Sequence, residues 1–323
     1  MKYTSLGKSG IKVSQLCFGT MTFGEAADEQ MSADLYAMCR DAGINFFDCA
    51  NVYAKGKSEL ILGKLCQDQR HEVLLATKAY YPMSQDVNAR GTSRKQLRLA
   101  LEGSLRRLNT DYIDVYYLHN FDTNTSLEET ISTLHDFIRE GKILYIGVSN
   151  FAAWQVMKAQ GIIARELLTT ISCIQPMYNL LKRQCESELL PMALNERISV
   201  FPYSPIAGGY LTGKYLNNKP DEGRFNTSKM YQKRYEDEQN EIGARKFIEF
   251  ASDNNYDPVS LAVAWVSGHA GVTAPIIGAR NTVQLKPALE SISIDMTDEL
   301  RATISEFTIT PAMANDREDD RGK

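Results

Sequence analysis

The sequence contains no apolar run long enough to cross a membrane and no marked excess of charge of one sign. A membrane helix needs about 20 consecutive apolar residues, and no stretch of the 323 residues approaches that length. The N-terminal segment also lacks the apolar core of a signal peptide. The formal net charge is -4, so the composition predicts neither nucleic-acid binding nor association with an anionic membrane.

Cysteines are few and scattered. None of them forms a Cys-x-x-Cys pair, which excludes the usual zinc sites, and a secreted disulfide framework belongs to shorter chains. We therefore expect reduced, mostly buried thiols in a reducing compartment and a cytoplasmic protein. No cluster of Asp, Glu or His has metal-ligand spacing, so no metal is predicted. The six cysteines are Cys17, Cys39, Cys49, Cys66, Cys173 and Cys185.

Short apolar runs alternate with longer amphipathic segments along the whole chain. This alternation predicts a parallel sheet, because parallel strands need helical crossovers between them. The predicted strands span 16–20, 44–48, 72–77, 112–118, 143–149, 171–175, 198–203 and 274–278. The predicted helices span 29–42, 57–68, 92–108, 126–140, 151–160, 183–196, 241–254 and 281–290.

Eight strand–helix repeats favour an α/β fold of the closed (β/α)8 TIM-barrel type, with a doubly wound sheet as the alternative. No Gly-x-Gly-x-x-Gly follows an early strand, which counts against the alternative. Such barrels need about 250 residues as one domain, so we expect residues 1–323 to form a single domain. The opening SLGKSGIKVS predicts an N-terminal hairpin that caps the bottom of the barrel.

Two segments interrupt the alternation. Residues 208–240 are polar, contain glycine and follow the seventh predicted strand. Loops of this length inside a domain are usually functional lids or disordered, so this segment predicts a lid. Residues 311–323 are highly charged and predict a mobile tail.

Four residues capable of acid–base chemistry follow three consecutive predicted strands: Asp48, Tyr53, Lys78 and His119. In such barrels the chemistry takes place at the carboxyl ends of the strands, so we expect these side chains to converge. Taken singly, each has an ordinary explanation as a cap, a core or rim residue, or a structural histidine. Their occurrence together at neighbouring strand ends favours a functional site.

A tyrosine beside a lysine and an aspartate is suited to donating a proton. Free tyrosine has a pKa near 10, which is high for acid catalysis at neutral pH. A nearby ammonium favours the phenolate and lowers this pKa, so Lys78 is expected to lower the pKa of Tyr53. Asp48 is expected to keep Lys78 charged and in position.

Six segments, taken in order, resemble the aldo-keto reductase superfamily over nearly the whole chain. The sequence is most similar to the bacterial branch that is related to the potassium-channel β subunits. The segments are FFDCANVYAKGKSE (46–59), LLATK (74–78), DYIDVYYLHN (111–120), GKILYIGVSNF (141–151), FPYSPIAGGYLTGKY (201–215) and PIIGARNTVQL (275–285).

The resemblance implies a role for each of the four residues. Tyr53 would be the general acid, Lys78 and Asp48 would tune its acidity, and His119 would orient the substrate carbonyl. No metal is implied. The expected reaction is the reduction of an aldehyde or ketone to an alcohol by hydride transfer from NADPH.

The resemblance also implies where NADP(H) binds. Ala288 stands where relatives carry an asparagine that reads adenine, which weakens adenine recognition but leaves the chemistry intact. The implied nicotinamide end comprises Gly19, Thr20, Met21, Asp48, Ser149, Asn150, Gln175 and Tyr203. The implied pyrophosphate and adenosine contacts are Ser204, Pro205, Ile206, Ala207, Leu211, Gly213, Lys214, Arg224, Gly278, Arg280 and Gln284.

Two alternatives to a reductase remain at the level of sequence. One is an NADP(H)-binding, redox-sensing regulatory subunit with slow turnover, and the other is a purely structural barrel, against which the intact group of four residues argues. The expected partner is a small carbonyl substrate; its identity and the oligomeric state are left open by the sequence. Candidate substrate-pocket residues are Phe23, Ala54, Tyr80, Tyr81 and Asn120.

Overall fold

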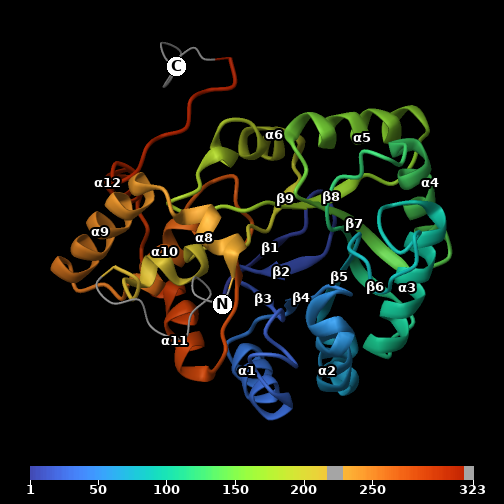
Figure 1. Ribbon diagram of the computed structural model, residues 1–323, viewed down its shortest axis with the longest axis horizontal. Coiled ribbons are helices and arrows are strands. Elements are labelled where there is room, and N and C mark those ends of the chain that lie inside the picture. Colours follow the sequence, from blue (N-terminus) through green and yellow to red (C-terminus); the bar gives the residue numbers. More distant parts are fainter. Residues whose placement is uncertain (217–227, 316–323) are drawn as a thin grey trace.

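The computed structural model describes residues 1–216 and 228–315. Its sheet has eight strands in the order β10-β3-β4-β5-β6-β7-β8-β9, and every neighbouring pair is parallel. Helices lie around the strands (Figure 1), so the predicted (β/α)8 fold is confirmed. The strands are β3 (Cys17–Gly19), β4 (Phe46–Asp48), β5 (Leu74–Ala79), β6 (Ile113–Leu118), β7 (Ile143–Ser149), β8 (Ile171–Gln175), β9 (Ser199–Val200) and β10 (Ile276–Ile277).

The first and last strands of this order close the ring only narrowly. β9 and β10 contain two residues each. Tyr203, just beyond β9, forms a parallel bridge with Ile276. The Ile276 N–H donates to the Pro202 carbonyl at 2.8 Å, and the Thr273 N–H donates to the Val200 carbonyl at 2.9 Å. A few backbone hydrogen bonds therefore make up the seam of the barrel.

The N-terminal hairpin is present as predicted. β1 (Tyr3–Ser5) pairs antiparallel with β2 (Lys12–Ser14). Leu6 and Val13 are fully buried and belong to the apolar cluster inside the barrel, which closes its lower end. The other buried members of that cluster are Cys17, Phe46, Ala76, Val115, Tyr117, Cys173, Phe201, Ala274 and Ile276.

Eight of the described helices match predicted ones, and three more, α8, α10 and α12, were not predicted. α5 extends beyond its predicted end. The described helices are α1 (Glu29–Asp41), α2 (Lys57–Cys66), α3 (Arg94–Leu108), α4 (Leu127–Arg139), α5 (Ala153–Arg165), α6 (Leu189–Glu196), α8 (Lys229–Tyr235), α9 (Glu238–Asp253), α10 (Pro258–Ser267), α11 (Thr282–Glu290) and α12 (Asp298–Ser305).

The helix predicted over 183–196 is wrong in its first half. A short 3-10 turn, η3 (Gln184–Glu186), precedes α6, which begins at Leu189. Pro191 lies in the first turn of α6, where its missing N–H costs nothing. Its ring would clash with the carbonyl of residue 187 in a continuous helix, so the chain restarts the helix instead.

The predicted lid over 208–240 is partly helical. η4 (Ala207–Thr212) overlaps its start, α8 lies within it, and α9 begins two residues before its end. Tyr231 and Tyr235 of α8 are buried against the body of the protein. Residues 217–227 of this segment, and 316–323 of the predicted tail, lie outside the described residues. In the described ranges, no helix is both long and apolar enough to span a membrane.

Candidate active site

Polar side chains continue the inward-facing rows of the strands at the mouth of the barrel. Alternate residues of a strand share a face, so Asp48 follows Phe46 on the inside of β4. Lys78 follows Ala76 in the same way on β5. The predicted strand ended at residue 77, whereas β5 runs to Ala79. Lys78 is therefore part of the barrel wall and not of its solvated rim.

The ammonium of Lys78 is the centre of the site. Its side chain is fully buried. Nζ donates to Asp48 Oδ2 at 2.6 Å, to the Cys49 carbonyl at 2.6 Å and to Tyr53 Oη at 3.2 Å. An ammonium has three hydrogens, so each has a partner. The positive charge is neutralised on one side and faces the tyrosine on the other.

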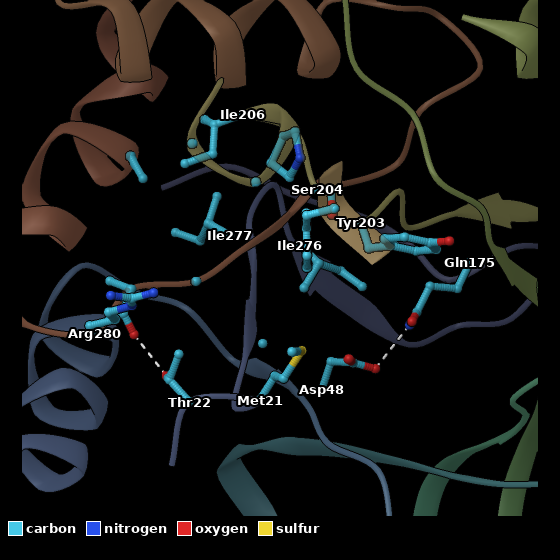
Figure 2. A pocket seen from close by; sticks show the side chains of 18 of the residues that line it. Met21, Thr22, Asp48, Gln175, Tyr203, Ser204, Ile206, Ile276, Ile277 and Arg280 are labelled. Atoms are coloured by element: carbon cyan, nitrogen blue, oxygen red, sulfur yellow. Dashed lines mark hydrogen bonds between the residues drawn. The ribbon is translucent and has the colours of Figure 1, made fainter. Parts of the chain in front are cut away.

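The carboxylate of Asp48 is held from both sides. Its second oxygen, Oδ1, accepts a hydrogen bond from Gln175 Nε2 at 2.9 Å, as Figure 2 shows. The side chain of Gln175 comes from β8, on the far side of the barrel from β4, which carries Asp48. Asp48 therefore ties the lysine to the opposite wall and fixes its direction.

The pKa of Tyr53 is governed by burial more than by the lysine. Burial raises the pKa of Tyr53 to about 12, while the charge of Lys78 acts in the opposite, lowering sense. The expected lowering by the ammonium is present, but desolvation outweighs it. Tyr53 is therefore protonated at neutral pH, and the Lys78 ammonium lies 3.2 Å from its hydroxyl.

The pKa of Lys78 shows why the pair stays ionic. Burial lowers the pKa of Lys78, but the contacts with Asp48 and Tyr53 raise it by more, so the net direction is upward. A buried ammonium is costly unless it is paired and hydrogen-bonded. Both conditions hold here, so the lysine carries its charge throughout the range in which proteins are handled.

His119 is a neutral imidazole beside the tyrosine. Burial, followed by the nearby charge of Lys78, lowers the pKa of His119 to about 3. Its ring stands edge-on to Tyr53, with centroids 6.0 Å apart, and edge-on to Tyr81 at 5.0 Å. Among the described residues, nothing hydrogen-bonds to its buried Nδ1. A neutral ring can orient a carbonyl through an N–H without bringing a charge.

A cavity of about 880 Å³ extends from these residues along the strand ends. Cavities of this size hold ligands the size of a cofactor. Tyr53 and His119 line one part of it. Of the residues predicted to bind the cofactor, those that line it are Gly19, Met21, Asp48, Ser149, Asn150, Gln175, Tyr203, Ser204, Pro205, Ile206, Lys214, Gly278, Arg280 and Gln284.

Four other predicted residues, all within the described ranges, do not line the cavity: Thr20, Ala207, Leu211 and Gly213. Thr20 is fully buried, and its hydroxyl donates to the Asp48 carbonyl at 3.1 Å and accepts from Ser58 at 2.9 Å. It therefore holds two strand ends together. Arg224 lies outside the described residues.

The loop after β7 forms a hydrogen-bonded network at the nicotinamide end predicted above. Asn150 adopts a left-handed conformation with φ 58°. Its Nδ2 donates to the His119 carbonyl at 2.9 Å and to Ser149 Oγ at 3.1 Å, and its Oδ1 accepts from Tyr203 Oη at 2.8 Å. Both amide hydrogens are engaged, so Asn150 can bind a ligand's carboxamide through the second lone pair of Oδ1 without breaking these bonds.

Arg280 marks the opposite side of the cavity (Figure 2). The Arg280 N–H donates to Gln284 Oε1 at 3.2 Å, and Gln284 N–H donates to Asn281 Oδ1 at 2.9 Å, which caps α11. Pro287 and Ala288 line this end as well. The absence of an asparagine at 288 therefore leaves an apolar wall there, with the cation and the start of a helix beside it.

Several lining residues were missed by sequence reasoning. Arg234 of α8 is a cation on the cavity wall, and its helix lay within the segment interpreted as a lid. Of the substrate-pocket candidates, Tyr81 and Asn120 line the cavity, whereas Phe23, Ala54 and Tyr80 do not in the described structure. The other missed residues are Thr22, Val52, Gly208, Gly209, Thr212, Met230, Tyr231, Val259, Val263, Ile276, Ile277 and Ala279.

The part of the chain that is described contains no group of three or more His, Cys, Asp or Glu residues placed to hold a metal ion. The six cysteines are all described, all buried and all unpaired. Burial raises the pKa of Cys49 to about 12, so its thiol beside Lys78 stays protonated. The prediction of reduced, buried thiols agrees with this arrangement.

The mouth of the (β/α)8 barrel thus combines a buried lysine–aspartate pair, which contacts a tyrosine, with a cofactor-sized cavity. The chain belongs to the Aldo/keto reductase family, whose model matches residues 15–309. Enzymes of this family use nicotinamide cofactors, so the chain is an oxidoreductase of that class.

Individual relatives agree with this assignment. The chain is 36% identical over 318 residues to the uncharacterized oxidoreductase YrpG of Bacillus subtilis, covering 95% of this chain and 96% of the relative. It is 35% identical over 320 residues to a probable voltage-gated potassium channel subunit beta of Oryza sativa, with 94% and 97% covered. It is 32% identical over 306 residues to norsolorinic acid reductase of Aspergillus flavus, with 90% and 76% covered.

Proposed function

We propose that this protein reduces an aldehyde or ketone to an alcohol with NADPH, and that Tyr53 is the general acid. The observation that carries the proposal is the position of Lys78 Nζ, which contacts both Asp48 and Tyr53 Oη inside the barrel mouth. The two contacts place a fixed positive charge where a phenolate forms. This is the arrangement required of a tyrosine that gives up its proton during the reaction.

In this proposal each reacting group has one role. The bound cofactor supplies the hydride. Tyr53 Oη donates its proton to the carbonyl oxygen, and Lys78 stabilises the resulting phenolate. His119, as a neutral ring, donates a second hydrogen bond to the same oxygen and orients the carbonyl. Positioning of this kind contributes several kcal/mol to lowering a barrier.

The residues of the cavity fit a nicotinamide dinucleotide. Tyr203 offers a flat ring beside Gln175, whose Oε1 is left over for a carboxamide because Asp48 engages Nε2. Lys214 and Arg280 supply positive charge for phosphates along the wall. We propose NADPH over NADH because Arg280, together with Arg224, suits a 2′-phosphate.

The test is a panel of aldehydes, ketones and sugars assayed with NADPH and, separately, with NADH. We expect carbonyl-dependent oxidation of NADPH with at least one class of substrate, at a higher kcat/KM than with NADH. Ethanol and carboxylic acids of matched size serve as controls that offer no reducible carbonyl. Loss of the NADPH signal at the same rate with and without every carbonyl would rule the proposal out.

The second candidate is a regulatory, redox-sensing subunit that binds NADP(H) and turns over slowly. It is favoured by the similarity to the probable channel subunits of Oryza sativa and Arabidopsis thaliana, the latter 34% identical over 304 residues. Cofactor that stays bound through gel filtration, together with a stable protein partner, would favour this role. We place either activity in the cytoplasm, because six reduced thiols suit a reducing compartment.

A further inference from the structure

The wall of the cofactor-sized cavity carries a positive charge that has no ligand in the proposed reaction. Among the described residues that line the cavity, Asp48 is the only carboxylate, and Lys78 neutralises it. The cations of the same wall are Lys214, Arg234 and Arg280. Lys214 and Arg280 are proposed to meet the phosphates of the cofactor, which leaves Arg234 without an assigned ligand.

Arg234 is half-buried on α8 and held against its own helix. Its guanidinium carbon lies 5.6 Å from the centre of the Tyr231 ring, and Tyr231 is buried against Gly208. In the part of the chain that is described, no carboxylate forms an ion pair with Arg234. A guanidinium that lines a cavity without a counter-ion is suited to bind an anionic ligand there.

The contacts of the neighbouring tyrosine show which part of the cavity Arg234 reaches. Tyr235 Oη accepts a hydrogen bond from Asn179 Nδ2 at 3.0 Å and donates to Met177 Sδ at 3.7 Å. Met177 in turn forms a parallel bridge with Tyr203, just beyond β8 and β9. The end of α8 that carries Arg234 is therefore docked beside Tyr203, which belongs to the implied nicotinamide end.

Tyr203 connects this cation to the reactive residues. Burial raises the pKa of Tyr203 to about 12, and the charge of Arg234 is the leading influence in the lowering direction, so the guanidinium lies within electrostatic range of the phenol. Tyr203 Oη donates to Asn150 Oδ1 at 2.8 Å, and Asn150 Nδ2 donates to the His119 carbonyl at 2.9 Å. A single amide side chain therefore separates the Tyr203 hydroxyl from His119, the residue proposed to orient the substrate carbonyl.

The nicotinamide itself offers no anion to a cation beside Tyr203. Its ring is neutral in NADPH and positively charged in NADP⁺, and its carboxamide is neutral. The competing partner is the pyrophosphate of the cofactor, which the resemblance places along 204–207 and at Lys214. The carbonyl substrate is the other ligand of this end, and an acidic group on it would neutralise Arg234.

A second arginine without an ion pair in the described chain stands near the same reactive residues. The guanidinium carbon of Arg90 lies 5.1 Å from the centre of the Tyr80 ring and 5.5 Å from that of Tyr81. Tyr81 lines the cavity, and its ring centre lies 5.0 Å from that of His119. Arg90 does not line the cavity, so it acts at a distance: it makes the potential at the substrate side more positive, which attracts anions.

We propose that the substrate is an aldehyde or ketone that carries a carboxylate, and that Arg234 pairs with this carboxylate. The assignment rests on the proposed carbonyl reduction and adds the class of substrate to it. A guanidinium can hold a carboxylate through two parallel hydrogen bonds, which fixes the end of the substrate remote from its carbonyl. Arg234 is thus a specificity residue and takes no part in the transfer of hydride or proton.

The test compares two probes of the same shape that differ in charge, para-formylbenzoate and para-formylbenzamide, with the whole protein and NADPH. The meta isomers of both probes are assayed as well, so that two positions of the carboxylate are covered. We expect kcat/KM for at least one acid to exceed that for its amide by about tenfold, the effect of one charged hydrogen bond. Arg234→Gln should lower this preference by about tenfold. Lys233→Gln, at an exposed neighbour on α8 that does not line the cavity, should keep it.

Three results would overturn the assignment. The first is an equal kcat/KM for acid and amide in both pairs of probes, and the second is a preference that survives Arg234→Gln. The third is a dissociation constant of NADPH that rises about tenfold in Arg234→Gln while the preference for the acid stays intact. This last result would show that Arg234 holds the pyrophosphate of the cofactor instead.

A binding measurement without turnover separates failure of this assignment from failure of the proposed reduction. The NADP⁺-saturated protein is titrated by calorimetry with para- and meta-(hydroxymethyl)benzoate and with the matching benzamides. We expect at least one acid to bind about tenfold more tightly than its amide, and Arg234→Gln to remove the difference, whether or not the protein reduces a carbonyl. Equal affinities for acid and amide would overturn the recognition of a carboxylate by itself.

Discussion

The two ends of the cofactor-sized cavity are built differently. At the reactive end, Lys78 and Asp48 are almost completely buried, and Gln175 joins them to the opposite wall through hydrogen bonds of 2.6–2.9 Å. At the other end, Arg280 and Gln284 are more exposed to solvent, and a hydrogen bond of 3.2 Å joins the Arg280 N–H to the Gln284 side chain.

This difference separates the residues that act on the reaction rate from the residues that set cofactor affinity. Donors and charges held rigidly out of water stabilise charge that develops during a reaction, because they need no rearrangement when it forms. Charges on a solvated wall instead attract an anion and set how tightly it binds. Substitutions at the reactive end should therefore change kcat, and substitutions at the far end should change the dissociation constant of the cofactor.

The largest effect is expected for Tyr53→Phe, which removes the proton donor and keeps the ring. General acid catalysis contributes about 10²–10⁴-fold, so kcat for carbonyl reduction should fall by that factor while NADPH binding stays nearly unchanged. Steady-state rates and fluorescence quenching measure the two quantities. A variant that keeps more than about a tenth of wild-type turnover, where at most ~1% is expected, would contradict the assignment.

The next effect is that of Lys78→Met, which removes the ammonium beside Tyr53. Without the ammonium, nothing offsets the effect of burial to the same extent, so the pKa of Tyr53 rises further. The kcat for carbonyl reduction should therefore fall sharply. The substitution should also destabilise the fold, because it leaves the buried charge of Asp48 without its partner. The free energy of unfolding should fall by about 3–5 kcal/mol.

A double variant separates the two consequences of losing Lys78. Lys78→Met combined with Asp48→Asn removes both charges, so denaturant unfolding should show stability restored relative to Lys78→Met alone. Turnover should stay low in the double variant, because the phenolate still lacks its ammonium. Recovery of turnover together with stability would show that Lys78 acts only through the fold.

A smaller effect is expected at the far end for Arg280→Ala. Loss of one charged hydrogen bond should weaken NADPH binding by about 1.5–3 kcal/mol and NADH binding little. Lys286→Ala is the matched control, since this lysine lies on α11 and is exposed, with a distant ion pair to Glu290 at 3.8 Å. Equal losses for both cofactors would show that Arg280 does not contact a 2′-phosphate.

The smallest effect is expected from pH. Reduction needs Tyr53 protonated, which is lost only as pH rises toward its pKa of about 12. Reduction also needs a neutral His119 ring, and the ring becomes protonated only as pH falls toward its pKa of about 3. The kcat for reduction should therefore be nearly flat between about pH 5 and 9, without the single-group limbs that report an essential acid or base. A limb near the ordinary pKa of histidine would show that the ring is protonated in the reacting complex.

The strands and their reactive ends could be predicted from the sequence because both are local signals. Each strand is a short apolar run, and Asp48, Lys78 and His119 follow such runs directly. α10 was not predicted because Leu261 to Val266 are apolar on every side, and a helix buried all around has no polar face to show its period. Asp257 as N-cap and Pro258 at the first position marked its start.

What the sequence could not supply depends on packing between distant elements. The net pKa of Tyr53 follows from how completely the barrel mouth excludes water, which no motif contains. Thr20 was predicted beside Met21 at the nicotinamide end, but its hydroxyl turns inward, where it accepts a hydrogen bond from Ser58, at the start of α2, at 2.9 Å. Arg234 reaches the cavity from α8, whose Tyr231 packs so closely on Gly208 that a Cβ there would lie 2.6 Å from the ring.

The narrow closure between β9 and β10 decides where the barrel opens locally. Two-residue strands joined by a few backbone hydrogen bonds form the least cooperative line in the ring, and local opening begins where such bonds are fewest. Tyr203 lies on one side of that line and Gly278 on the other, and both face the same cavity. A molecule that contacts both residues binds only while the ring is closed, so its binding free energy adds to the stability of the closed barrel.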